Sequence, residues 1–351
     1  MDLSKVIRPN ILALAPYSCA RDEFKGEASV YIDANESPYE NGVNRYPDPL
    51  QHSVKVLLAQ RKGVREEQIF LGNGSDEAID LIYRIFCEPR IDNVVAISPS
   101  YGMYKVCADV NDVDYRPVSL TDDFQLDVSA LYAKVDERTK VIWICSPNNP
   151  SGNAFQLSEL EFIVQHFPDQ MVVIDEAYID FSEKGSMLSV LDQYDNLIVL
   201  QTFSKAWGQA AIRCGIAYAQ PAVIQYFNRV KYPYNINVLT QQAAIRALSQ
   251  PEVHDRHVEE ILSGREILRI LLGSLKTIEH IYPSDANFLL VRMKLDGMDS
   301  GQSADYVYHF LQNKGIIVRN RTRVHLCQGC LRVTVGTPDE NATLYETLKT
   351  L

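Results

Sequence analysis

Short apolar runs alternate with amphipathic stretches through the middle of the chain. The runs are rich in β-branched residues and have no alternating polar face, which is typical of strands covered by helices on both sides of a sheet. The predicted strands lie at 94–98, 140–146, 171–177, 197–202 and 215–219. Amphipathic stretches such as 157–167 supply helices between them. The pattern predicts an α/β fold with a mostly parallel sheet between helices.

The last third of the chain has a different pattern. After a long helical region at about 237–275, shorter segments follow in the order strand, helix, strand, strand and helix. This order is typical of a small α+β domain. The proline-containing first forty residues predict an arm and a loop. We therefore expect an N-terminal arm with part of a small domain (1–45), a large domain (46–260) and a small C-terminal domain (261–351).

Composition and charge narrow the classes of function. The 351 residues are 46% hydrophobic and 23% charged, as in ordinary globular proteins. We find neither an apolar run of about 18 residues nor a signal-peptide core, so we expect a cytoplasmic protein with no membrane partner. The formal net charge of −11 argues against nucleic acid as a partner.

We expect no disulfide framework, because the seven cysteines are scattered along the chain and odd in number. His325, Cys327 and Cys330 include one Cys-x-x-Cys spacing. A structural zinc site normally needs four ligands, and no second such pair exists. No metal is therefore expected.

A basic segment stands out in this acidic chain. Between residues 314 and 332 there is no acidic residue, and the basic ones are Lys314, Arg319, Arg321, Arg323 and Arg332. Such a segment fits a solvated loop and strand edge, or a site for an anion.

Polar residues follow the predicted strands, at the edge where ligands bind in open α/β sheets. Lys205 lies just beyond strand 197–202, where an isolated charge is costly to desolvate. Asp175 follows four apolar residues, and a buried carboxylate requires a cationic partner or good donors. Asn149 also fits a turn, and Tyr101 also fits the core. These side chains are expected at one rim.

A glycine-rich stretch precedes a predicted helix start. Gly72 and Gly74 are followed by Ser75 and Asp76. Glycines let the backbone approach a ligand closely, and the free N–H groups of a helix start bind phosphate. Ser75 also fits a plain helix cap.

Taken together, these residues suit one cofactor, pyridoxal 5′-phosphate. Its aldehyde takes a lysine as a Schiff base, and its pyridinium nitrogen takes an aspartate. Its ring requires an aromatic face, and its phosphate requires N–H groups and an arginine such as Arg213. The cofactor explains why Lys205 lies at the mouth of a buried strand.

Longer motifs carry a family resemblance almost from end to end. They include "IDANESP" (32–38), "NRYPDP" (44–49), "GNGSDEAID" (72–80), "SPNNPSGN" (146–153), "TFSKAWGQAAIRCG" (202–215) and "CLRVTVGTPDEN" (330–341). The chain resembles the fold-type-I pyridoxal-phosphate aminotransferases, and most closely the histidinol-phosphate aminotransferase family.

The resemblance implies a role for each matching residue. Lys205, Asp175 and Tyr178 would be catalytic, with Lys205 as the Schiff-base lysine. The implied cofactor contacts are Tyr46, Ser75, Asp76, Tyr101, Asn149, Asp175, Tyr178, Thr202, Ser204, Lys205 and Arg213. The implied substrate contacts are Tyr17, Asn35, Glu36, Arg319 and Arg332. Tyr46 would come from the neighbouring subunit, which implies a homodimer with composite active sites.

The implied reaction is ping-pong transamination between L-histidinol phosphate and 2-oxoglutarate in histidine biosynthesis. The alternatives are an aromatic-amino-acid aminotransferase or a threonine-phosphate decarboxylase of the same fold, and, in another class, a non-catalytic binding or regulatory protein. Two departures leave substrate preference open. Arg321, Arg323 and His325 are additional basic residues, and Trp207 stands where a smaller aromatic is expected.

Overall fold

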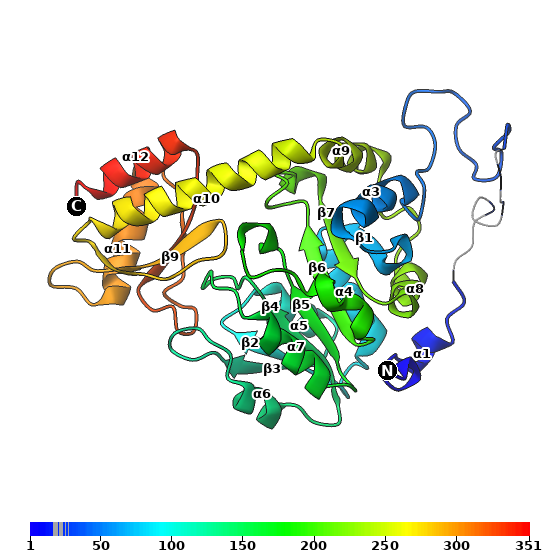
Figure 1. The fold of residues 1–351 in the computed structure, drawn as a ribbon, viewed down its shortest axis with the longest axis horizontal. Helices are drawn as coiled ribbons and strands as arrows, with labels where there is room; N and C mark the ends of the chain where they lie inside the picture. Colours follow the sequence, from blue (N-terminus) through cyan, green and yellow to red (C-terminus); the bar gives the residue numbers. More distant parts are fainter. Residues whose placement is uncertain (17–19, 21–23, 25, 27) are drawn as a thin grey trace.

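The computed structural model describes residues 1–16, 20, 24, 26 and 28–351, and its largest element is a seven-stranded sheet (Figure 1). The strands lie in the order β1-β7-β6-β5-β4-β2-β3. Their bounds are β1 Ile69–Asn73, β2 Asn93–Ser98, β3 Asp114–Ser119, β4 Thr139–Cys145, β5 Met171–Asp175, β6 Leu197–Thr202 and β7 Cys214–Tyr218. The five predicted strands are confirmed, β6 with its predicted bounds and the other four with ends shifted by one or two residues.

Neighbouring strands from β3 to β6 are parallel, whereas β7 is antiparallel to both β1 and β6. Residues 203–213 connect β6 to β7, and a parallel crossover needs a dozen or more residues. The predicted strand 171–177 ends at Asp175, because the chain turns there and the Ala177 amide donates to Asp175 Oδ1.

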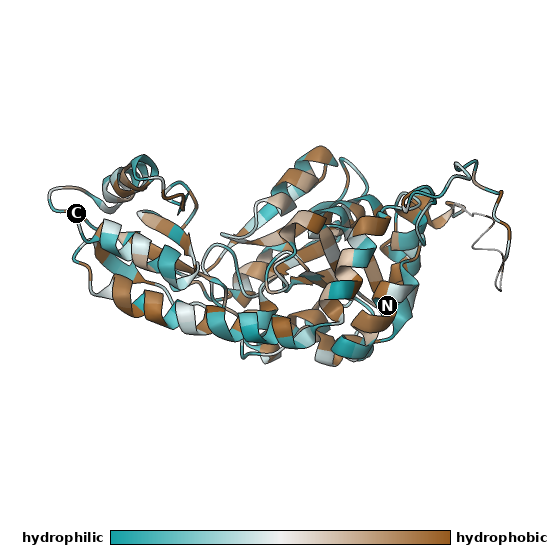
Figure 2. Cartoon of the chain, turned by 90° about the horizontal axis from the view of Figure 1, so that it is seen from above, coloured by the Kyte–Doolittle hydropathy of each residue, from teal (hydrophilic) through white to brown (hydrophobic). Residues whose placement is uncertain are grey.

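Helices cover both faces of this sheet, so every residue of β4 except Lys140, and all of β5 and β6, is buried. On one face the core includes residues of α1 (Pro9–Leu12), α4 (Ser75–Phe86), α5 (Met103–Val110) and α8 (Pro221–Val230). On the other it includes residues of α3 (His52–Lys62), α6 (Val128–Lys134), α7 (Leu157–His166) and α9 (Val238–Leu248). Figure 2 shows both hydrophobic (brown) and hydrophilic (teal) residues on these helices, as is typical of helices with one face in the core.

A smaller antiparallel sheet has the order β10-β11-β9-β8. Its strands are β8 Ile278–Ile281, β9 Phe288–Met293, β10 Arg319–Asn320 and β11 Cys330–Thr334, and it packs with α11 (Ser300–Asn313) and α12 (Pro338–Leu348) around its own core. The α/β fold with a mostly parallel sheet and a small α+β part is therefore confirmed. The first predicted strand of this part is in fact two, β8 and β9.

One long helix, α10 (Pro251–Gly273), joins the two sheets along one side of the molecule (Figure 1). It contacts β8, β9 and α12 near one end, and α9 and the short helix η3 (Ile179–Phe181) near the other. The expected domain boundary at residue 260 falls inside this helix. In the part of the chain that the structure describes, no helix combines the length and apolarity that crossing a membrane requires.

The described residues of the N-terminal arm, from about 28 to 46, form no helix or strand and run out from the body (Figure 1). Glu36 organises this segment. Its carboxylate accepts from Arg45 Nη1 at 2.9 Å and from the backbone N–H of Tyr46 at 2.6 Å.

Candidate active site

A cavity of about 140 Å³ lies beyond the carboxyl ends of β4, β5 and β6. Parallel strands end at the same rim, which explains how residues far apart in sequence meet here. All the expected cofactor contacts except Tyr46 line the cavity, namely Ser75, Asp76, Tyr101, Asn149, Asp175, Tyr178, Thr202, Ser204, Lys205 and Arg213.

Asp175 is the most buried charged group of the cavity, with 3% of its surface exposed. Oδ2 accepts from the phenol of Tyr104 at 2.6 Å, and Oδ1 accepts from the Ala177 amide at 3.1 Å. Burial raises the pKa of Asp175, whereas the Tyr104 hydrogen bond lowers it. Among the described residues no cation forms a salt bridge with this carboxylate. Its geometry thus suits a cationic partner inside the cavity.

Tyr104 was not expected from the sequence. It is fully buried, its ring stacks on Trp143 at 4.8 Å, and Trp143 stacks on Tyr83 at 5.6 Å. The Tyr83 hydroxyl donates to the Tyr104 carbonyl at 2.6 Å. This stack holds the phenol toward Asp175. The signal in the sequence is the spacing of three from Tyr101, which lies just before α5; the two rings meet edge to face at 5.7 Å.

Lys205 lies in the loop after β6, with Nζ 5.6 Å from the centre of the Tyr178 ring. Burial lowers the pKa of Lys205, and the charge of Arg332 lowers it further. No described residue forms a salt bridge with this amine. Both effects favour the neutral form, which is the form that acts as a base or nucleophile.

The start of α4 forms one wall of the cavity, with Gly74 at φ +73° before Ser75. A Cβ on Gly74 would lie 2.6 Å from Arg213 Nη2, and one on Gly215 would lie 2.1 Å from the Ser75 nitrogen. Glycine at both positions therefore lets Arg213 and β7 approach the helix start. Exposed N–H groups beside an arginine form a typical phosphate site.

Asp76 organises the same wall. Oδ1 accepts from the Tyr101 hydroxyl at 3.0 Å, and Oδ2 accepts from Arg213 Nη2 at 3.3 Å. Thr202 Oγ1 accepts from the Ser204 amide at 3.0 Å and shapes the turn before Lys205. These bonds hold the aromatic face, the arginine and the lysine loop around one volume.

The small sheet reaches this cavity through Arg332. Its Nη1 donates to Asn149 Oδ1, and its guanidinium lies 5.2 Å from the centre of the Phe288 ring. Burial lowers the pKa of Arg332. Arg319 lies directly opposite Arg332 in the antiparallel pair of β10 and β11. The two expected substrate arginines thus share one face of the small sheet.

Three further expected residues lie elsewhere. Tyr46, 51% exposed and stacked on Tyr234 at 4.5 Å, lines a separate groove with Asn35 and Glu36. Tyr17 lies outside the described residues. Within the chain as described, no group of three or more His, Cys, Asp or Glu side chains is arranged to hold a metal.

Glu176 follows Asp175 but does not line the cavity. It is 2% exposed and accepts hydrogen bonds from Ser186 Oγ (2.6 Å), Gln201 Nε2 (2.9 Å) and the Met187 amide (2.7 Å). Burial raises the pKa of Glu176 to about 7. Its bonds fix the turn after β5, so its role is to support the loop that carries Tyr178.

Known proteins resemble this chain over most of its length. The family Aminotransferase class I and II matches residues 24–348. A histidinol-phosphate aminotransferase of Parabacteroides distasonis is 52% identical over 350 residues, which cover 100% of this chain and 99% of that protein. One of Bacteroides thetaiotaomicron is 53% identical over 348 residues, covering 99% and 98%.

The fold comparison agrees. The crystal structure of histidinol-phosphate aminotransferase from Sinorhizobium meliloti, in complex with pyridoxal-5′-phosphate, aligns with a TM-score of 0.77 and 25% identity, covering 87% of this chain and 82% of that one. The family match spans nearly all of the chain, and the relatives cover its whole length. The chain therefore belongs to the class I and II aminotransferases.

Proposed function

We propose that this chain is a pyridoxal-phosphate-dependent enzyme that transfers the amino group of L-histidinol phosphate to 2-oxoglutarate. The products are imidazole acetol phosphate and L-glutamate, in histidine biosynthesis. One cavity carries the proposal, because Lys205, the buried Asp175 and the start of α4 meet in it. The names of relatives that are 52% and 53% identical over the whole chain support this choice of substrate.

The residues present fit this cofactor. The buried carboxylate of Asp175 would hold a protonated ring nitrogen, which is the cation that its surroundings favour. The ring of Tyr101 would supply the stacking face, and the N–H groups of α4 with Arg213 would bind the phosphate. When bound, pyridoxal phosphate supplies an aldehyde for the amino group and a ring that withdraws electrons.

Lys205 would move the proton at Cα of the amino donor. A base must be neutral, and burial together with the Arg332 charge lowers the pKa of Lys205 in that direction. Tyr178 packs edge-on against Phe288 at 5.2 Å, which fixes its ring beside the lysine. Lys205 would thus act beside a Tyr178 ring that its packing on Phe288 holds in place.

The arginines of the small sheet would bind the anionic end of each substrate. Arg332 and Arg319 lie opposite one another on β11 and β10, and Arg332 reaches Asn149 at the cavity. A guanidinium binds a phosphate or a carboxylate with two parallel hydrogen bonds. The same pair would therefore serve the phosphate of the donor and a carboxylate of 2-oxoglutarate in turn.

A homodimer with composite sites is also part of the proposal. Tyr46 lies on the arm, which runs out from the body, and it lines a groove outside the central cavity of its own chain (Figure 1). In the proposed dimer, Tyr46 would contribute to the cavity of the neighbouring subunit. We also propose a cytoplasmic location, since the six cysteines in the described part are free thiols, as is usual in reducing compartments.

The test compares amino donors. The holoenzyme would be assayed with L-histidinol phosphate, L-phenylalanine, L-tyrosine and L-threonine phosphate, each with 2-oxoglutarate. We expect kcat/KM to be highest for L-histidinol phosphate. A higher value for an unphosphorylated aromatic amino acid, or release of carbon dioxide from L-threonine phosphate, would overturn the substrate assignment.

A further inference from the structure

Arg321 lies just after β10, on the side of the small sheet that carries the two substrate arginines. Its amide donates to the Cys330 carbonyl at 2.8 Å, one residue beyond the last pair of β10 and β11. Side chains two residues apart on a strand point to the same face, as do directly opposite ones. Arg321 therefore shares a face with Arg319, Arg332 and Cys330.

The electrostatics agree with this placement. Burial lowers the pKa of Arg321 to about 10, and the charges of Arg332 and Arg319 contribute to the shift. In turn, the charge of Arg321 acts to lower the pKa of Tyr178, which lines the central cavity. Arg321 is thus close to both arginines and to the cavity wall.

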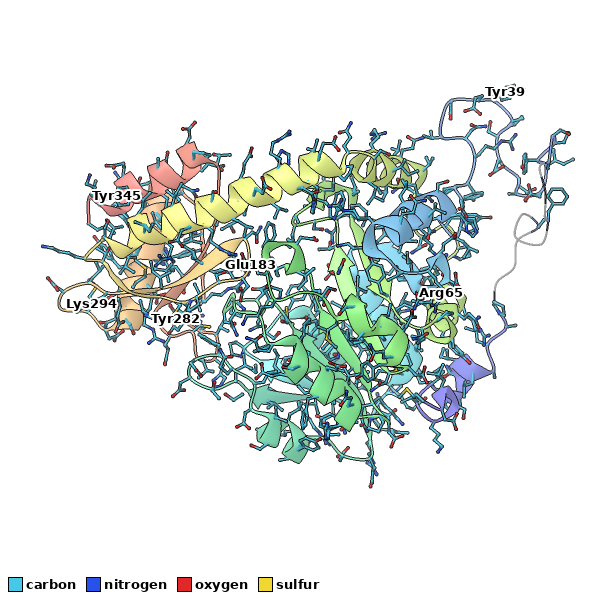
Figure 3. The ribbon with its side chains drawn as sticks, in the orientation of Figure 1. Tyr39, Arg65, Glu183, Tyr282, Lys294 and Tyr345 are labelled. Atoms are coloured by element: carbon cyan, nitrogen blue, oxygen red, sulfur yellow. The ribbon has the colours of Figure 1, made fainter. Side chains whose placement is uncertain are left out.

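No described carboxylate forms a salt bridge with any of the three arginines. Nε of Arg321 and Nε of Arg332 are both buried without a hydrogen-bond partner among the described residues. Like charges on neighbouring strands repel, and an anion would stabilise the partly buried guanidinium groups of Arg321 and Arg332. Arg292 lies on the same face but packs over the ring of Tyr282 at 5.5 Å (Tyr282 is labelled in Figure 3).

We infer that Arg321 is a third arginine of the substrate-anion site, and that it binds the phosphate ester of the amino donor together with Arg319 and Arg332. The inference rests on the proposed function and refines it. One fork-shaped guanidinium already satisfies a carboxylate. A phosphate monoester has three terminal oxygens and nearly two negative charges, so it suits three converging guanidinium groups.

The segment itself offers a control. Arg323 lies two residues further along and is exposed, and no side-chain hydrogen bond or ion pair joins it to another described residue. Arg323→Gln removes the same charge from the same segment. A comparison with Arg321→Gln therefore separates a direct contact from a general change of potential.

The first measurement is the inhibition constant of inorganic phosphate against the amino donor, with the cofactor phosphate site filled in the holoenzyme. We expect Arg321→Gln to raise this constant about tenfold, which is the loss of about 1.4 kcal/mol. Arg323→Gln should change it less than about twofold. Arg321→Lys keeps the charge but not the fork, so it should give an intermediate value. It also provides a folded variant should Arg321→Gln be unstable.

The second measurement separates this inference from the proposed function. Arg321→Gln should raise KM for L-histidinol phosphate about tenfold with kcat nearly unchanged, and should leave kcat/KM for L-histidinol nearly unchanged. If the wild-type enzyme does not prefer L-histidinol phosphate to L-histidinol, the proposed function is overturned. In that case the inhibition constants of inorganic phosphate would still show whether Arg321 binds an anion. Equal effects of the two Gln variants, or equal losses for both donors, would overturn the inference alone.

Discussion

The phenol oxygen of Tyr104 lies 2.6 Å from Oδ2 of Asp175 and donates a hydrogen bond to it. Because this bond favours the ionised carboxylate, Tyr104→Phe should weaken the hold of Asp175 on a cationic ring nitrogen. A hydrogen bond to a charged group contributes about 1.5–3 kcal/mol, so we expect at least tenfold weaker cofactor binding. Equilibrium titration of the apoenzyme with pyridoxal phosphate would measure it.

Tyr218→Phe is the matched control for that prediction. Tyr218 is another fully buried tyrosine, and its hydroxyl has no hydrogen-bond partner among the described residues. Its removal should leave cofactor affinity within about twofold, since no bond is lost. If the two variants bind the cofactor equally well, Tyr104 does not position Asp175.

Lys205→Ala should abolish turnover and change the visible absorption of the bound cofactor. General acid–base catalysis contributes about 10²–10⁴-fold, and no other described amine lines the cavity. Steady-state rates and absorption spectra would be recorded beside Lys105→Ala, which removes a lysine that is 60% exposed on α5. Wild-type turnover by Lys205→Ala without added amines would remove the lysine from the mechanism.

Gly215→Ala should disturb the phosphate end of the site. The added Cβ would lie 2.1 Å from the Ser75 nitrogen, so the start of α4 must move. We expect a larger loss of affinity for pyridoxal phosphate than for pyridoxal, which has no phosphate. Gly102→Ala is the control, because a Cβ there meets nothing within 4 Å. Equal losses for both ligands would place the damage away from the phosphate.

The raised pKa of Glu176 predicts that the free energy of unfolding depends on pH. Burial raises its pKa from 4.5 to about 7, so between these values the folded chain keeps a proton that the unfolded chain has released. The stabilisation is complete below about pH 4.5 and is lost as the pH rises through about 7, at up to about 1.4 kcal/mol per pH unit. Glu176→Gln should remove this slope in urea unfolding experiments. Parallel curves for both proteins would contradict the prediction.

A mixed dimer tests the proposed contribution of Tyr46 to the site of a neighbouring subunit. Tyr46→Ala and Lys205→Ala chains, each shown to be inactive alone, would be refolded together. One of the two sites in the heterodimer then carries both changes and the other carries neither. Activity should return to about half that of wild type per mixed dimer. No recovery in a verified heterodimer would assign Tyr46 to its own chain's site.

The strands that the sequence predicts are those that are buried on both faces, such as β5 and β6, because burial on both sides makes an apolar run. β3 has no such run. It is an edge strand in which only Val118 is buried, and it contains Pro117, so periodicity could not reveal it. The direction of β7 depends on the short connection from β6 rather than on the residues of the strand itself.

The sequence predicted those site residues whose charge stands out at the end of a buried strand. Asp175 ends one buried strand and Lys205 follows another, and burying either charge without a partner is costly. Tyr104 lies inside a helix and resembles any core aromatic, so only the packing on Trp143 reveals its bond to Asp175. The alignment of Arg321 with Arg332 likewise depends on strand register, which the sequence of a two-residue strand does not specify.

The helix α10 has a mechanical consequence for the reaction. Its 23 residues form a rod about 34 Å long. A tilt of about 5° where it meets α9 displaces its far end by about 3 Å, which is the length of a hydrogen bond. The small sheet packs near that far end, so it would move with the helix when the helix tilts. Ser249 and Gln250, between α9 and α10, are the residues at which such a tilt would change the distance from Arg319 and Arg332 to the cavity.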